Sequence, residues 1–211
     1  MSQNSTNDNN ININNYIKII LLGESKVGKT SLISAFNGDA FIEENLATIC
    51  FSSIKKDITI DNTVYRVEIW DTAGQERYRS VNQLVIKGSQ IIIFVYDITN
   101  IESFSKLEFW VNYVKELINA DIVFGLVGNK VDLFEDYEKD QIVDGEKGKQ
   151  YAKDIGALFT EASAKENPKA FYDFVKKIII KFISNRKETE KDWNRISLVS
   201  NIPKKKNKKC C

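Results

Sequence analysis

One run of eight residues constrains the fold more than any other, because it matches the pattern G-x-x-x-x-G-K-[ST]. The run is Gly23-Glu24-Ser25-Lys26-Val27-Gly28-Lys29-Thr30. It follows a β-rich apolar stretch at residues 16–22 and opens a helical pattern at residues 29–37. In that context the pattern forms a phosphate-binding loop. We expect its backbone N–H groups to surround phosphates, Lys29 to reach the β- and γ-phosphates, and the Thr30 hydroxyl to bind Mg²⁺.

Further strands and helices follow in alternation. Residues 54–60 and 64–70 predict a hairpin about Asp61-Asn62-Thr63. Residues 90–96 and 122–128 are short, continuous apolar runs, as in strands covered on both faces. Helical spacing places one apolar face on Phe104, Leu107, Trp110 or Val111, Val114, Leu117 and Ile118. We therefore predict an α/β fold with a mostly parallel, doubly wound sheet and ligand sites at the carboxyl ends of its strands.

The ends of the chain differ in composition from its middle. Residues 1–15 contain seven Asn and are predicted to be disordered. A final helix is predicted with Asn167 as N-cap and Pro168 at its first position. Its buried stripe is Phe171, Phe174, Val175, Ile178 and Phe182. Beyond it polarity rises, so we expect a folded domain at residues 16–184 and a flexible tail at residues 185–211.

Charge and cysteine content exclude several classes of protein. The net charge of +1 includes five lysines within the last eight residues. Without these lysines the chain has 25 basic and 29 acidic groups. That distribution is unlike the basic face of a nucleic-acid-binding protein. The three cysteines are Cys50, Cys210 and Cys211, which offer neither a disulfide framework nor metal-ligand spacing, and there is no His. We expect a reducing compartment, no signal peptide and a soluble body.

A second motif, Asn129-Lys130-Val131-Asp132, follows the apolar run at residues 122–128. An Asp carboxylate can accept two N–H bonds from the edge of guanine, which adenine cannot supply. Asn129 and the stem of Lys130 would support the loop and the base. The run Ala162-Ser163-Ala164-Lys165 follows the last predicted strand, where a backbone N–H could meet the guanine O6. Together with the phosphate loop, these residues favour guanine.

A third motif ends the predicted hairpin: Trp70-Asp71-Thr72-Ala73-Gly74-Gln75-Glu76. Asp71 would hold Mg²⁺ through a water molecule. The Gly74 N–H can meet the γ-phosphate, and Gln75 can orient the attacking water.

Taken in order, these motifs resemble the Ras superfamily of small GTPases. Trp70, the run Gln75-Glu76-Arg77-Tyr78-Arg79, the run Phe94-Val95-Tyr96-Asp97-Ile98-Thr99 and the terminal Cys-Cys resemble the Rab branch. The resemblance covers residues 16–183 and the last two cysteines, and implies a six-stranded G domain. It implies that Thr48 binds Mg²⁺ and the γ-phosphate in the GTP state, and that Phe41 packs beside guanine. The alternatives are a structureless loop for Thr48 and a core position for Phe41.

Two segments depart from the Rab pattern. Cys50-Phe51-Ser52-Ser53 stands where Rab proteins usually carry Gly-Val-Asp-Phe, and Val85-Ile86-Lys87-Gly88-Ser89 stands in place of Tyr-Tyr-Arg-Gly-Ala. Only Trp70 remains of the aromatic triad that shapes Rab effector surfaces. The nucleotide chemistry is not affected, but no effector can be carried over from the family.

The last nine residues add a membrane signal. Rab proteins with such an end carry geranylgeranyl groups on both cysteines, which implies lipidation of Cys210 and Cys211 beside the lysines. The resemblance further implies an exchange factor, a GTPase-activating protein, a GDP-dissociation inhibitor, a prenylation escort and GTP-state effectors. It places the protein on the cytoplasmic face of a membrane, with a cytosolic pool. The alternative is a solvated lysine run with incidental cysteines.

These features together predict a Rab-like GTPase that switches between GTP and GDP in membrane traffic. One rival is a scaffold that stays bound to GTP, which Ser25 and Lys26 in the phosphate loop leave open and Gln75 argues against. A P-loop kinase or ATPase is disfavoured by Asp132 and by the lack of a separate lid segment.

Overall fold

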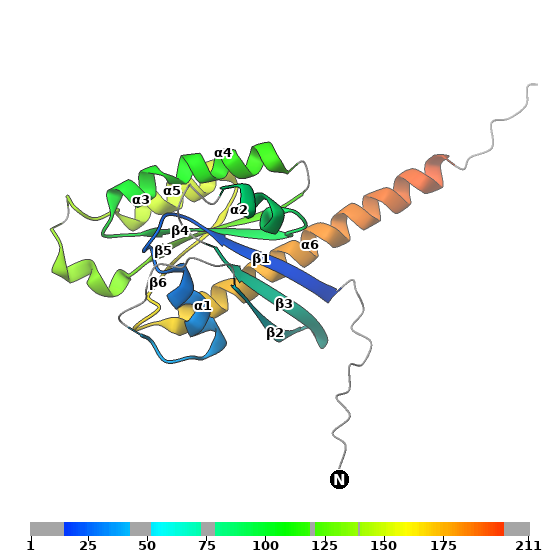
Figure 1. Ribbon diagram of the computed structural model, residues 1–211. Coiled ribbons are helices and arrows are strands. Elements are labelled where there is room, and N and C mark those ends of the chain that lie inside the picture. Colours follow the sequence, from blue (N-terminus) through cyan, green and yellow to red (C-terminus); the bar gives the residue numbers. More distant parts are fainter. Residues whose placement is uncertain (1–14, 43–51, 73–78, 119–120, 139, 201–211) are drawn as a thin grey trace, which may run out of the picture.

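The computed structural model describes residues 15–42, 52–72, 79–118, 121–138 and 140–200 (Figure 1). The strands in this part of the chain are β1 Tyr16–Leu22, β2 Ser52–Ile60, β3 Thr63–Asp71, β4 Ile91–Asp97, β5 Val123–Asn129 and β6 Leu158–Ala162. The α-helices are α1 Lys29–Asn37, α2 Arg79–Ile86, α3 Ile101–Ser105, α4 Leu107–Leu117, α5 Gly145–Ile155 and α6 Pro168–Ser200. A 3₁₀ helix, η3, covers Val131–Asp136.

The six strands form one sheet in the order β2-β3-β1-β4-β5-β6. Only β2 runs antiparallel, pairing with β3. The other neighbours pair in parallel, so β3, β1, β4, β5 and β6 all end at the same edge. This confirms the predicted α/β fold with a six-stranded, mostly parallel sheet.

The hairpin between β2 and β3 turns on two residues rather than three. Asp61 and Asn62 have φ values of 48° and 60°, and Thr63 already pairs with Ile60. Asn and Asp tolerate this left-handed conformation better than other non-glycine residues, and two such residues match the twist of the strands they join. The predicted hairpin is therefore confirmed, with a tighter turn.

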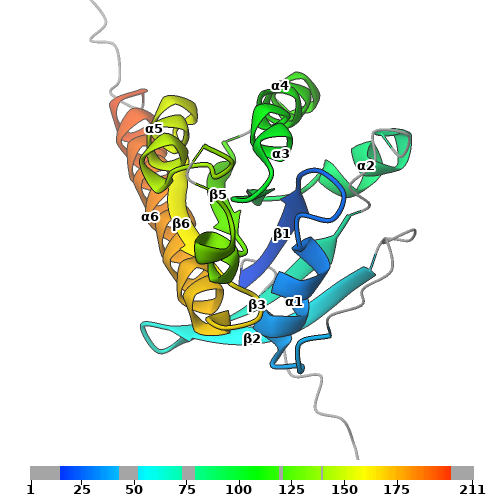
Figure 2. The same ribbon diagram turned by 90° about the vertical axis from the view of Figure 1, so that its left-hand side faces the viewer.

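Helices cover both faces of the sheet (Figure 2). On one face α1 and α6 pack against the strands, with the ring of Phe36 edge-on to that of Phe171 at 6.3 Å. On the other face α2, α4 and α5 enclose a second core around Trp110 and Phe94. The predicted apolar face of residues 104–118 lies in that second core, where Trp110 and Val111 are both buried.

The last helix begins as predicted but ends later. The Asn167 side chain accepts a hydrogen bond from the Ala170 N–H at 3.2 Å, and α6 starts at Pro168. We expected the helix to give way to a flexible linker near residue 185, yet α6 continues to Ser200 and projects from the body (Figure 1). Residues 169–200 contain no Gly or Pro and are rich in Glu, Lys and Arg, which are good helix formers despite their polarity.

Its predicted stripe is also found. Phe171, Phe174, Val175 and Ile178 are buried, and Phe182 is partly buried against the same core. Across the described part of the chain, no helix has the length and apolarity needed to cross a bilayer. The division of the chain at residue 184 stays a prediction.

Candidate functional site

The loops that carry the predicted motifs meet at one edge of the sheet. Asp71, Asp97, Asn129 and Ala162 are the last residues of β3, β4, β5 and β6. Asp97 pairs with Asn129, and Asn129 with Ala162, so these strand ends are in register. Because β1 lies between β3 and β4, the loop that follows Leu22 enters the middle of this edge.

That loop, residues 23–28, has a backbone that suits an anion. A Cβ on Gly23 would lie 2.1 Å from the Val95 carbonyl oxygen, so only glycine lets the loop cross β4. Gly28 is the N-cap of α1 at φ 92°, and Lys26 is also left-handed at φ 66°. The N-cap makes no side-chain hydrogen bond, and the first turn of α1 holds no acidic residue. The amides of that turn, with the helix dipole, therefore favour a bound phosphate.

Lys29 is held across the mouth of this loop. Its ammonium donates to the carbonyl oxygens of Gly23 at 2.9 Å and Glu24 at 2.7 Å, and the residue is 5% exposed. Burial lowers the pKa of Lys29 to about 8, against the opposing effect of the Asp71 and Glu24 carboxylates. A phosphate beside this ammonium would stabilise its charged form.

Beside the loop lies a pair of oxygen groups that fits Mg²⁺. The Thr30 hydroxyl donates to the Asp71 carboxylate at 2.7 Å, and Asp71 is 2% exposed. Hydroxyl and carboxylate oxygens are the ligands that Mg²⁺ prefers. The next residue, Thr72, donates from its hydroxyl to the Leu21 carbonyl at 2.6 Å, which anchors the end of β3 to β1.

Asn129 joins the two nucleotide motifs directly. Its side-chain amide donates to the Val27 carbonyl at 2.9 Å, although the residues are 102 positions apart. A Cβ on Gly28 would lie 2.3 Å from the same amide nitrogen. The Asn129 amide oxygen is buried and has no hydrogen-bond partner among the described residues. Such an acceptor fits a ligand that brings its own donor.

Lys130 is fixed by an ion pair rather than by its own loop. It adopts a left-handed conformation at φ 69°, and its ammonium lies 2.6 Å from the Asp97 carboxylate. The other Asp97 oxygen accepts from the Thr99 N–H at 2.9 Å and hydroxyl at 2.8 Å. With Asp97 only 6% exposed, this arrangement holds the Lys130 stem over the strand ends.

The remaining residues predicted to bind guanine lie in the loops after β5 and β6, near Lys130. Asp132 lies in the first turn of η3, partly exposed, in a loop that starts from the fixed Lys130. The buried Ser163 hydroxyl accepts from the N–H groups of Lys165 at 3.1 Å and Glu166 at 2.9 Å, which shapes the turn at Ala164. The turn follows β6, next to β5, and so adjoins the loop of Asp132.

The structure also places the side chains of the predicted residues Glu24, Ser25, Lys26, Val27 and Phe41. The Glu24 carboxylate accepts from the indole N–H of Trp110 at 3.0 Å, so only its backbone faces the loop interior. Phe41 is 41% exposed, which excludes the alternative of a core position. Ser25 is partly exposed and Lys26 exposed, whereas Val27 is buried in the core beneath the loop.

Five predicted residues lie outside the described part of the chain: Thr48, Gly74, Gln75, Cys210 and Cys211. Their roles stay predictions. Conversely, sequence reasoning did not predict that Asp97 positions Lys130, that Thr72 anchors β3, or that Trp110 holds Glu24. A signal for Asp97 was available, because it follows a buried strand just as Asp71 and Asn129 do.

A comparison with known protein families finds a match over most of the chain. The model of the Ras family aligns with residues 18–181, which is more than half of the 211 residues. The match includes both nucleotide motifs, the Asp71 motif and most of the sheet, and ends before the lysine-rich tail.

Proposed function

The chain belongs to the Ras family and is a small GTPase that hydrolyses GTP, and we propose that it acts as a Rab-like, membrane-anchored switch in vesicle traffic. Membership of the family decides against the P-loop kinase and ATPase alternatives. The trafficking role, the anchor and the individual residue roles below are parts of the proposal.

Phosphate and metal are bound at the loop after β1. The backbone from Gly23 to Thr30 surrounds the phosphates, and the buried Lys29 faces the β- and γ-phosphates. Thr30 and Thr48 would bind Mg²⁺, and Asp71 would hold the ion from behind them. When bound, Mg²⁺ neutralises charge on the β- and γ-phosphate oxygens. The hydrogen bond from the Thr30 hydroxyl to the Asp71 carboxylate supports this assignment.

Guanine is bound at the loops after β5 and β6. Asp132 accepts two N–H bonds from the base, while Asn129 and Lys130 hold the loop in position. Ser163 shapes the turn that presents the Ala164 and Lys165 backbone to the guanine O6, and Phe41 covers the base from the side.

Hydrolysis and switching depend on the residues that touch the γ-phosphate. Gln75 orients the attacking water, and the Gly74 N–H and the Thr48 hydroxyl contact the γ-phosphate. Loss of that phosphate releases both segments, which gives two states that partners can distinguish.

One observation carries the nucleotide part of the proposal: the hydrogen bond from Asn129 to Val27, which joins the base loop to the phosphate loop. Its test is single-turnover hydrolysis by the full chain loaded with GTP and Mg²⁺. Gln75→Leu should keep nucleotide binding but fall below the wild-type rate, which we expect on the order of 10⁻⁴–10⁻² s⁻¹. Equal rates for the two proteins, with and without an activating protein, would refute the role of Gln75. No measurable wild-type turnover would favour the scaffold alternative.

The membrane part rests on Cys210, Cys211 and the five lysines. Lipid on two cysteines, or on one cysteine beside a basic cluster, supplies the two signals that stable anchoring needs. The partners are those of Rab proteins: an exchange factor, a GTPase-activating protein, a GDP-dissociation inhibitor and a prenylation escort. The helix α6 adds support, because it carries the start of the tail away from the nucleotide edge.

A further inference from the structure

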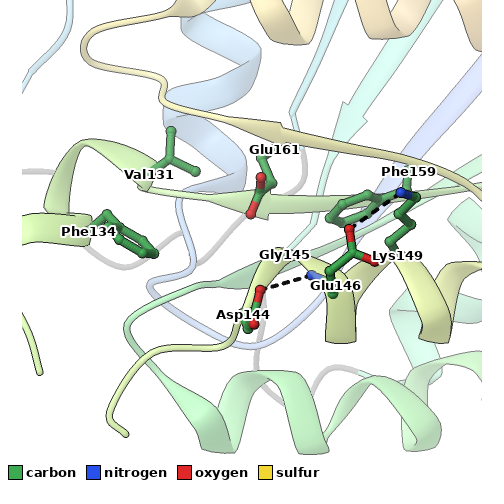
Figure 3. A pocket seen from close by; sticks show the side chains of 8 residues that line it. All are labelled: Val131, Phe134, Asp144, Gly145, Glu146, Lys149, Phe159 and Glu161. Atoms are coloured by element: carbon green, nitrogen blue, oxygen red, sulfur yellow. Dashed lines mark hydrogen bonds and ion pairs between the residues drawn. The ribbon is translucent and has the colours of Figure 1, made fainter. Parts of the chain in front are cut away.

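A pocket lies beside the nucleotide edge of the sheet, between η3, the start of α5 and the end of β6 (Figure 3). It is an open pocket of about 520 Å³. Its lining has three acidic side chains, two aromatic ones and one lysine: Val131, Phe134, Asp144, Gly145, Glu146, Lys149, Phe159 and Glu161. None of the functional assignments above uses this pocket.

The three carboxylates that line the pocket differ in their hydrogen-bond and ion-pair partners. Asp144 caps α5 by accepting from the Glu146 N–H at 3.0 Å, and Lys149 pairs with the Glu146 carboxylate at 3.4 Å. The Glu161 carboxylate receives no hydrogen bond or ion pair from any described residue, whereas the Glu161 backbone carbonyl accepts from the Thr160 hydroxyl at 3.2 Å. Figure 3 shows its carboxylate pointing into the space between Phe134 and the first turn of α5. Burial and the nearby charges of Asp144 and Glu146 raise the pKa of Glu161, and the cation Lys149 of the lining pairs with Glu146 instead.

A buried hydroxyl behind the pocket is a second, independent sign of an incomplete site. Tyr96 is fully buried, and its hydroxyl has no hydrogen-bond partner among the described residues. A Cβ on Gly148 would lie 2.3 Å from this oxygen and 2.8 Å from the Phe159 ring. The hydroxyl therefore lies close to the ring of Phe159, and that ring lines the pocket. Buried polar groups without a partner are rare in native proteins.

The chemistry of the pocket selects an organic cation rather than a metal ion. Within the described residues, no group of acidic, His or Cys side chains is arranged to hold a metal. The side chain of Phe134, 49% exposed, and the ring of Phe159 add flat apolar walls to the carboxylates. A guanidinium can stack on such rings and bind a carboxylate through two N–H groups, whereas the ammonium of Lys is a compact point charge.

The surface around the pocket also favours a basic partner. Residues 132–146 contain seven acidic side chains and one lysine. A field of one sign attracts and orients a segment of the opposite sign. The 33 residues of α6 extend about 50 Å from their start beside β6 and so lead away from the pocket.

We propose that this pocket receives an arginine side chain from a basic segment of a partner protein, with Glu161 as its main ion-pair partner. This is a second binding surface, separate from the nucleotide site. It does not depend on the trafficking role.

The test uses the ¹⁵N-labelled full chain with GDP and Mg²⁺, titrated with three nine-residue Gly-Ser peptides. They carry three arginines, three lysines or three citrullines, the last being a neutral analogue of arginine. We expect the arginine peptide to shift the amide signals of Val131, Phe134 and Phe159, and to bind at least about fivefold more tightly than the lysine peptide. The citrulline peptide should not bind. Nucleotide occupancy, measured separately, distinguishes a failure of this proposal from a failure of the nucleotide site.

A pair of matched variants locates the effect. Glu146→Gln with Glu161→Gln should weaken binding of the arginine peptide about tenfold or more. Glu108→Gln with Glu116→Gln removes the same charge from exposed positions on α4 and should leave binding unchanged.

Equal affinity in both variants, signal changes elsewhere, or no binding would overturn the proposal. So would tighter binding of a peptide with the sequence of residues 201–211, because it would assign the pocket to the tail of a second copy.

Discussion

Gly28→Ala tests the junction between the phosphate loop and the base loop. The new methyl group meets two obstacles: a backbone at φ 92°, and the Asn129 amide nitrogen 2.3 Å from its ideal position. The left-handed backbone costs about 1–2 kcal/mol. Displacing Asn129 breaks its bond to the Val27 carbonyl and leaves a buried polar group unsatisfied, at about 1–3 kcal/mol. The unfolding free energy should therefore fall by about 2–5 kcal/mol.

Gly156→Ala is the matched control. Gly156 has a similar φ of 74°, but nothing lies within 4 Å of its added Cβ, so this variant should lose only the backbone cost. The unfolding free energies of the two variants should therefore differ by about 1–3 kcal/mol, which corresponds to about 5–150-fold in the unfolding equilibrium constant. Because Gly28 and Asn129 both border the proposed nucleotide site, we also expect weaker GDP binding in Gly28→Ala alone. Urea unfolding at fixed excess GDP and displacement of a fluorescent GDP measure the two effects. Equal losses of stability and unchanged GDP affinity in both variants would refute the reasoning.

Three further predictions follow. Asp132→Asn replaces an acceptor by a donor and should move the preference from guanine toward xanthine nucleotide; unchanged GTP preference in a competition assay would contradict the role of Asp132. Replacing Cys210 and Cys211 with Ser should leave GTP binding intact and move the protein to the soluble fraction of cells, with no lipid mass on its terminal peptide; a membrane-bound variant would show that the anchor lies elsewhere. Because burial and neighbouring carboxylates raise the pKa of Glu161 above its usual 4.5, the folded state loses stability as the pH rises from about 4.5 through that raised pKa. Glu161→Gln should therefore be more stable than wild type at pH 7, with the difference vanishing near pH 4; greater wild-type stability at pH 7 would contradict this.

The sheet could be predicted because its signals are local. β1 and α1 have the predicted bounds, and the other predicted strands agree with the structure to within two residues. Glycine, apolar runs and Asn167 with Pro168 mark these elements without reference to the rest of the chain. The end of α6 was mispredicted because it, too, was judged from a local signal. Polarity was taken as a sign of a linker, whereas helix propensity and the absence of Gly and Pro kept the helix intact to Ser200.

Contacts between distant segments could not be predicted. The pairs Asn129–Val27, Lys130–Asp97 and Trp110–Glu24 join motifs that are 33 to 102 residues apart. Their formation depends on strand order and register, which the motifs alone do not define. The acidic pocket is a similar case, because Glu161 and Asp144 become neighbours only when α5 packs against β6.

The most direct test of this account is the nucleotide selectivity of the purified chain. Dissociation constants for GDP, GTP and ATP, measured by displacement of a fluorescent GDP in Mg²⁺, compare the bases on the same phosphate loop. If Asp132 and Asn129 recognise guanine, GTP and GDP should bind at least ~10⁴-fold more tightly than ATP. Comparable affinities for ATP and GTP would contradict the assignment of the base loop.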